Sequence, residues 1–310
     1  MAPRIVQIST SALICSFVLL PLLAVWGQAD GPTGLGPADW SALRFTILQA
    51  ALSALLSTLS AVPLARALAR AQFWGRAAVI RLMGAPFILP VIVAILGLIA
   101  VFGQNGWLNT GLRSLGFGSF SIYGLQGVLL AHVFFNLPLA TRMILLGWAT
   151  IPQERLRLGQ SLDLRGFARF RLIEFPMLMT VLPSAVVVIF VICLSSFTVA
   201  LALGGGPKST TLELAIYQAF RFDFTPGRAA VLAVMQLALV LGAGLLARRF
   251  ADTVTGDALR GRVVQRWDRS GQVGDTVWIG AAALFLLAPM AAVVWKGAPG
   301  VIGLPTPVCQ

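Results

Sequence analysis

Polar side chains that could do chemistry are few in this sequence and lie in apolar surroundings. The only histidine, His132, stands four residues before Asn136, so a helix would place both on one face. A single histidine excludes a cluster of histidine metal ligands and argues against a Ser–His–Asp triad. Polar groups inside apolar helices either bond neighbouring helices or line a polar passage. Both roles are open for His132 and Asn136. For Gln49 and Gln236 we favour bonds between helices, but all four are candidates for a translocation pathway.

Residues 204–210, with the sequence GGGPKST, look at first like a phosphate-binding loop. That motif requires one glycine directly before the lysine and another five residues earlier. Pro207 and Ala202 occupy those two positions. We therefore expect a tight turn here, because glycine adopts positive φ angles without steric cost. We expect no ATPase motif, no enzymatic activity and no cofactor.

A second chemically informative segment spans residues 151–176, which are rich in arginine. Leu158 and Leu162 are spaced to fall on one face of a short helix, with Arg155 and Arg165 at the two ends of that face. An apolar ridge with basic ends is suited to a groove on another protein. The alternative is a helix lying at anionic lipid headgroups.

The composition indicates what must position these residues. The chain has 310 residues, of which 58% are apolar and 11% charged, and its mean hydropathy is +0.87. A soluble domain carries about 25% charged residues, so the composition argues against a soluble enzyme and predicts an all-α, polytopic membrane helical bundle. Three cysteines, Cys15, Cys193 and Cys309, form no disulfide or metal-ligand pattern, and the first two are interpreted as small buried apolar residues.

Seven apolar stretches are long enough to cross a bilayer, which takes about 20 residues. They cover residues 8–26, 42–65, 79–103, 125–148, 177–203, 229–247 and 276–295. The alternate connecting segments differ in basic residues, with sixteen Lys or Arg on one side and four on the other. Because basic loops stay in the cytoplasm, the N-terminus is predicted to be cytoplasmic and residue 310 periplasmic.

The seventh stretch repeats features of the first. Residues 17–26 and 285–295 share Phe, Leu, Pro, Val and Trp in the same order, and internal repeats are typical of duplicated transporters. We expect residues 1–275 to form a first half and residues 276–310 to begin a second half that is cut short. A complete chain that dimerises is the alternative. The apolar face of the lone seventh helix is then expected to meet lipid or a neighbouring chain.

The loop 151–176 resembles the coupling segment of binding-protein-dependent ABC importer permeases. In that family an acidic-Ala-Ala triplet precedes a glycine by four residues, and Ile-x-Leu-Pro closes the segment thirteen residues later. Here the closing proline is Pro176, so the triplet falls on Arg157, Leu158 and Gly159 and the glycine on Asp163. The acidic residue and the glycine are therefore replaced. The resemblance implies that Arg157, Leu158, Gly159, Leu162 and Asp163 dock an ATPase subunit.

Residues 121–127, 131–142 and 203–219 resemble one branch of that family, the permeases for thiamine or thiamine diphosphate. Ferric-iron permeases are the nearest alternative branch. The resemblance implies a six-span type I ABC permease core in the bacterial inner membrane, driven by a separate ATPase and loaded by a periplasmic binding protein, with no nucleic-acid partner. A stand-alone secondary transporter is the alternative of a different class. It would be expected to carry ionisable residues at mid-membrane, and the predicted mid-spans contain no Asp, Glu, Lys or Arg.

Overall fold

The computed structural model describes residues 34–71, 73–164, 166–251 and 273–302, together with eight separate positions between residues 9 and 27. These described residues form helices and connecting turns, without a strand. Six of the helical segments are long and apolar enough to cross a membrane. The chain is therefore an all-α, multi-pass membrane protein, as the composition predicts. The expected first span, residues 8–26, lies largely outside the described residues.

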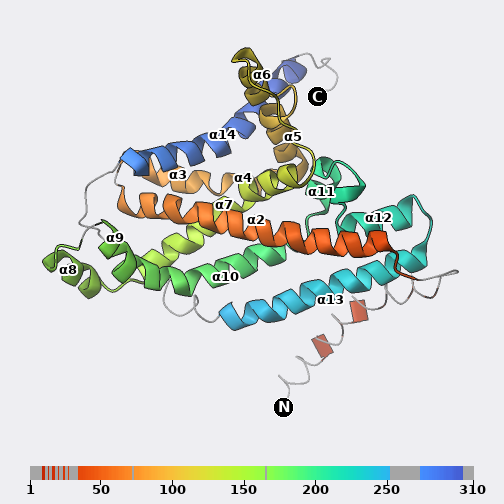
Figure 1. The fold of residues 1–310 in the computed structure, drawn as a ribbon, viewed down its shortest axis with the longest axis horizontal. Helices are drawn as coiled ribbons and strands as arrows, with labels where there is room; N and C mark the ends of the chain where they lie inside the picture. The colour runs from red at the N-terminus through yellow and green to blue at the C-terminus, as the bar shows by residue number, and fades with distance from the viewer. Residues whose placement is uncertain are drawn as a thin grey trace.

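The helices follow one another in the order drawn in Figure 1. Their bounds are α2 (Pro37–Arg70), α3 (Arg76–Leu82), α4 (Ala85–Ile88), α5 (Val91–Phe102), α6 (Trp107–Ser114), α7 (Leu125–Ala149), α8 (Gln153–Ser161), α9 (Gly166–Arg169), the π-helix η1 (Phe170–Glu174), α10 (Phe175–Leu194), α11 (Phe197–Leu203), the 3₁₀ turn η2 (Pro207–Ser209), α12 (Leu212–Arg221), α13 (Pro226–Ala251) and α14 (Val273–Ile302).

Two predicted spans differ from the observed helices. The stretch 79–103 is not one helix, because Pro90 lacks an N–H and holds Leu89 in an extended conformation. The membrane-crossing segment begins only at Val91. The stretch 177–203 is also divided, since α10 ends at Leu194 and α11 begins at Phe197. Pro138, in contrast, lies inside the continuous helix α7.

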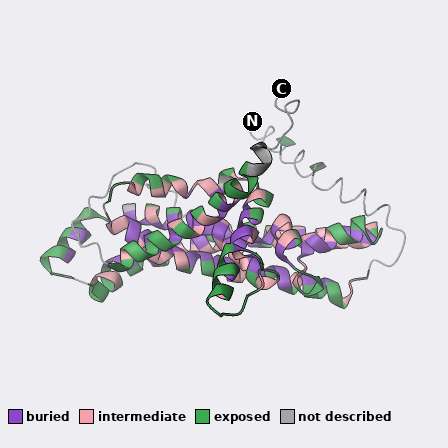
Figure 2. Ribbon diagram, turned by 90° about the horizontal axis from the view of Figure 1, so that it is seen from above, coloured by how far each residue is buried: buried purple, intermediate pink, exposed green. Residues whose placement is uncertain are grey.

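Helix α2 is the centre of the bundle and packs against α7, α10, α12 and α14. Its buried side includes the small residues Ala50, Ser53, Ala54, Ser57 and Ala61, which let neighbouring helix backbones approach closely. Buried residues run through the middle of the bundle, and exposed residues gather at its two ends (Figure 2). Helices α8 and α9 lie at one end, and α11 and α12 lie toward the other (Figure 1).

An ion-pair network fixes the end of the bundle that carries α12. Arg228, at the start of α13, lies with its Nη2 atom 2.7 Å from Asp39 Oδ1 and with its Nη1 atom 3.0 Å from Asp223 Oδ2. Asp39 is buried in the first turn of α2. The three residues therefore join the starts of α2 and α13 to the loop that follows α12.

The seventh predicted span, observed as α14, packs within this chain against α5 and α2. Its buried residues include Ala282, Leu286 and Ala292, and the Phe285 ring lies 6.2 Å from Phe102 and 5.9 Å from Phe134, measured between ring centroids. The expectation that its apolar face meets only lipid or another chain is therefore wrong. The buried residues of α5 include the small residues Ala94, Gly97 and Ala100, which let α14 approach closely.

The tightest point of that contact is Gly97 of α5. A Cβ atom at this position would collide with the backbone oxygen of Pro289 and lie 2.9 Å from Val293 Cγ2. We expect Gly97→Ala to lower the stability of the detergent-solubilised protein by about 1–3 kcal/mol, as over-packing does, measured as a lower Tm.

Gly280 of α14 supplies the matched control, because a Cβ there would meet nothing within 4 Å. Gly280→Ala should leave Tm unchanged or raise it, since alanine favours a helix over glycine by about 1 kcal/mol. Equal Tm values for Gly97→Ala and the parent protein would contradict the close α5–α14 contact.

Candidate functional site

The predicted ridge lies on α8, which starts directly after Pro152. Leu158 and Leu162 are 61% and 70% exposed, whereas Leu156 is 8% exposed. Arg157 is exposed beside them, and Arg165 lies outside the described residues. The structure thus presents two leucine side chains to the surroundings at one end of the bundle, as the spacing predicts. Their role in docking a partner remains a prediction.

The opposite face of α8 rests on the chain that leads into α10. Gly159 is buried, and a Cβ atom there would lie 2.6 Å from the Ile173 Cδ1 atom of η1. A packed contact therefore joins the helix of the exposed leucines to η1, which continues into α10. This close approach explains why glycine is suited to the last position of the triplet.

Asp163 occupies a left-handed turn, with a φ of 47°. The Leu164 N–H donates to the Gly159 carbonyl at 2.8 Å, and the Asp163 N–H donates to the Gln160 carbonyl at 2.9 Å. These two bonds form a Schellman motif, which usually places glycine at the left-handed position. Aspartate tolerates this conformation better than most residues. The glycine that the family motif would place here therefore has a structural explanation, and its replacement by Asp163 preserves the turn.

We expect Asp163→Gly to leave transport intact and to raise the stability by up to about 1 kcal/mol, since glycine adopts this φ without strain. Asp163→Val should lower the stability, because β-branched residues disfavour positive φ angles. Thermal unfolding of the two purified variants checks both expectations. A lower Tm for the glycine variant would contradict this explanation of the turn.

An ion pair ties the same segment to α2. Arg66 Nε lies 2.6 Å from Glu174 Oε2, and the Glu174 side chain is fully buried. The Arg66 guanidinium carbon also lies 5.4 Å from the centre of the Phe170 ring, a distance at which a cation is attracted to an aromatic face. Glu174 and Phe170 both belong to the π-helix η1, a rare element that often marks functional segments.

The predicted polar residues meet at the other end of α10. Gln49 Nε2 of α2 donates to the Cys193 carbonyl at 2.8 Å, and Gln236 Nε2 of α13 donates to the Leu194 carbonyl at 2.9 Å. Because α10 ends at Leu194, these carbonyls have no partner in a following turn. The two glutamine side chains supply the missing donors, so the predicted hydrogen bonds between helices are observed.

His132 and Asn136 of α7 face the same place. Asn136 Nδ2 donates to the His132 carbonyl at 2.9 Å and lies 3.3 Å from Cys193 Sγ. His132 Nδ1 is 2.8 Å from Ser53 Oγ. Sequence reasoning missed Ser53 and assigned Cys193 only an apolar role. The one available signal was that Ser53 follows Gln49 by four residues and so shares its helix face.

Five buried polar atoms around this helix end have no hydrogen-bond partner among the described residues. They are Gln49 Oε1, His132 Nε2, Asn136 Oδ1, Ser196 Oγ and Gln236 Oε1. Buried polar atoms are normally bonded to protein or to ordered water, so their concentration makes the α10–α11 break a candidate binding region. We call Gln49, His132, Asn136, Ser196 and Gln236 the polar cluster.

Glu213 of α12 lies against the break between α10 and α11, and sequence reasoning assigned it no role. Its carboxylate lies close to the backbone N–H groups of Phe197 and Ser196 and to the Ser195 hydroxyl. Burial raises the pKa of Glu213 above its usual value, although these donors act in the opposite direction. A carboxylate at this position stabilises the N-terminus of α11.

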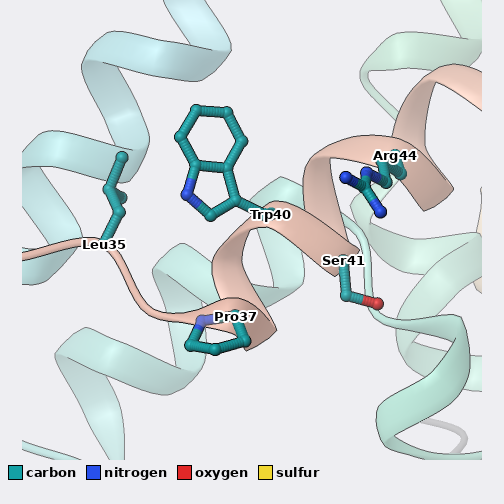
Figure 3. Close-up of a pocket in the computed structure, with 5 residues that line it drawn as sticks. All are labelled: Leu35, Pro37, Trp40, Ser41 and Arg44. Atoms are coloured by element: carbon teal, nitrogen blue, oxygen red, sulfur yellow. The ribbon is translucent and has the colours of Figure 1, made fainter.

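Two hollows of about 440 Å³ each lie elsewhere on the protein. One, at the start of α2, is lined by Leu35, Pro37, Trp40, Ser41 and Arg44, and Figure 3 shows the Trp40 indole standing out from the first turn of the helix. Tryptophan and arginine are typical anchors at a membrane surface. The other hollow is an apolar groove between α2, α7 and α14.

The chain is similar to several permeases of known name. It is 43% identical over 300 residues to the thiamine transport system permease protein ThiP of Escherichia coli, a match that covers 94% of this chain and 55% of that protein. The ThiP protein of Brucella abortus is 45% identical over 228 residues, covering 73% of this chain and 42% of the relative.

A more distant match is the sulfate transport system permease protein CysW of Synechococcus elongatus, 28% identical over 182 residues, or 58% of this chain and 63% of that protein. No model of a known protein family matches the sequence. The chain spans about half the length of the thiamine permeases that it matches. These similarities, together with six apolar helices long enough to cross a membrane, show that the chain belongs to the family of ABC importer permeases.

Proposed function

We propose that this chain is part of the membrane-spanning subunit of an ABC importer for thiamine or thiamine diphosphate in the inner membrane. The observation that carries the proposal is the similarity to thiamine permeases over 94% of the chain. The exposed leucine ridge of α8 supports it, because a translocation subunit needs a contact surface for the protein that hydrolyses ATP. In this proposal Leu158 and Leu162 form that contact, with Arg157 beside them and with Gly159 and Asp163 shaping the helix.

The proposal includes a direction across the membrane. The end with α8 faces the cytoplasm and an ATPase, and the end with α12 faces the periplasm and a substrate-binding protein. The N-terminus is then cytoplasmic and residue 310 periplasmic, in keeping with the excess of basic residues on the α8 side. The polar cluster lies between the two ends, where His132, Asn136, Gln49 and Gln236 border the route of the substrate.

Single cysteines test this direction in a background without Cys15, Cys193 and Cys309. Cysteines at Ser114 and Ser209 should react with a membrane-impermeant maleimide added to intact cells. A cysteine at Ser161, on α8 and exposed, should react only after the cells are opened. Labelling of the Ser161 position in intact cells would reverse the proposed orientation.

The function itself is tested by deleting the gene in a strain that cannot synthesise thiamine. The deletion should abolish uptake of labelled thiamine at nanomolar concentration, and a plasmid with the full gene should restore it. Uptake of ferric iron, measured in the same cells, should not change. Undiminished thiamine uptake, or a selective loss of iron uptake, would refute the proposed substrate.

A further inference from the structure

Beside the polar cluster the structure gathers aromatic rings around a carboxylate. Glu213 and Tyr217 are four residues apart on α12 and so share one helix face. The Tyr217 ring lies 5.3 Å from Phe197 and 5.7 Å from Phe222, measured between ring centroids, with both pairs meeting edge to face. We call Glu213, Tyr217, Phe197 and Phe222 the aromatic patch. Its rings come from the start of α11, from α12 and from the residue after α12.

The patch is open to the surroundings. Tyr217 is 38% and Phe222 65% exposed, and Ser195, whose hydroxyl lies close to Glu213, is exposed as well. The break that follows α10 interrupts the apolar run 177–203, and polar groups within such a run face a polar route or a neighbouring helix rather than lipid.

We propose that the aromatic patch binds an organic cation, which rests its positive charge on the Tyr217 face beside the Glu213 carboxylate. Aromatic rings attract large, weakly hydrated cations and form the sites that recognise quaternary ammonium groups. The carboxylate adds the opposite charge and disfavours anions. A metal ion fits this place poorly, because no group of three or more His, Cys, Asp or Glu side chains that could hold one occurs among the described residues.

The neighbouring unpartnered oxygen atoms extend the site inward. Gln49 Oε1, Asn136 Oδ1 and Gln236 Oε1 are acceptors without a donor among the described residues, so they suit N–H groups or the positive end of a ligand leaving the patch. The closest cation on the same face of α12 is Arg221, two turns from Glu213 and about 12 Å along the axis. At physiological salt, where the screening length is about 8 Å, its repulsion is weak.

The identity of the cation rests on the proposed function: thiamine carries a quaternary thiazolium ring, which is aromatic and permanently positive. The patch then receives the thiazolium end of the substrate as it enters the membrane domain. The site itself requires only an organic cation, so its test can be separated from that of the transported substrate.

The test measures equilibrium binding of labelled thiamine to the purified full chain in lipid nanodiscs. Tetramethylammonium should compete, and the uncharged thiazole half of thiamine should not. Glu213→Gln, which keeps an acceptor for α11 but removes the charge, and Tyr217→Leu should each weaken binding by about tenfold or more, whereas Tyr217→Phe should retain it.

The control variants are Glu154→Gln and Tyr123→Leu, at an exposed glutamate of α8 and at the other tyrosine of the chain. Both should bind as the parent does.

Unchanged affinity in Glu213→Gln and Tyr217→Leu, or equal competition by the neutral thiazole, would overturn the site. The uptake assay in cells distinguishes this failure from that of the proposed function. Normal thiamine uptake by both variants would refute the site and leave the substrate assignment standing. Binding of tetramethylammonium that depends on Glu213 and Tyr217, in a chain that does not transport thiamine, would support the site and refute that assignment.

Discussion

Replacing Leu158 and Leu162 together by aspartate is expected to abolish transport and to release the ATPase subunit, while the permease remains folded in the membrane. Both side chains are mostly exposed, so the free permease loses little packing. In the complex, burying one leucine contributes about 2 kcal/mol, and a buried unpaired carboxylate adds a further penalty. The loss of about 4 kcal/mol or more corresponds to a dissociation constant raised about a thousandfold.

The measurement is the amount of ATPase that co-purifies with the tagged permease, together with thiamine uptake in cells. Gln153→Asp with Gln160→Asp is the matched control, because it adds the same two charges at exposed polar positions of the same helix. This control should keep both the ATPase and transport. Retention of the ATPase by the leucine double variant would show that the ridge is not the docking surface, and the alternative of a lipid-bound helix would gain support.

The helices that were predicted best are those that depend on residues close together in the sequence. Helix α8 follows from the 3.6-residue spacing of its apolar residues after Pro152. Long apolar runs likewise locate four of the six described membrane-crossing helices closely, whereas the predicted segment 79–103 starts too early and 177–203 starts and ends too late.

The features that were missed depend on residues far apart in the sequence. No proline or glycine marks the break at Ser195 and Ser196, and hydropathy continues across it, so a single span was predicted. The break is stabilised by Gln49 and Gln236 from two other helices, which donate to the last carbonyls of α10, and Glu213, about 17 residues further along the chain, lies against it. Pro138, which does carry a local signal, lies within an unbroken helix. At the break, hydrogen bonds from Gln49 and Gln236 therefore outweigh the local preference for a continuous helix.

Replacing Arg66 by methionine is expected to lower the stability by about 3 kcal/mol, as loss of one partner of a buried ion pair does. The Arg66 Nε atom lies 2.6 Å from Glu174 Oε2, and Glu174 is fully buried. Methionine keeps an apolar stem over Phe170 but supplies no charge. The exposed Arg171, in the same π-helix, is the matched control, and Arg171→Met should change the stability by no more than about 0.5 kcal/mol.

The same ion pair is also expected to affect the coupling of ATP hydrolysis to transport. The reason is that η1 packs against α8 and continues into α10. In Arg66→Met the ATPase should still bind to the intact leucine ridge and hydrolyse ATP, while uptake per ATP hydrolysed falls, since α2 no longer follows the movement of η1. Adding Glu174→Gln removes the buried charge that has lost its bond to Arg66, so the double variant should recover part of the lost stability, with a coupling energy of about 0.5–3 kcal/mol between the two sites. The double variant should not restore the amount of thiamine taken up per ATP hydrolysed. Equal Tm values and equal uptake per ATP hydrolysed in Arg66→Met and Arg171→Met would contradict this prediction. They would show that the Arg66–Glu174 pair neither stabilises η1 nor links α2 to it.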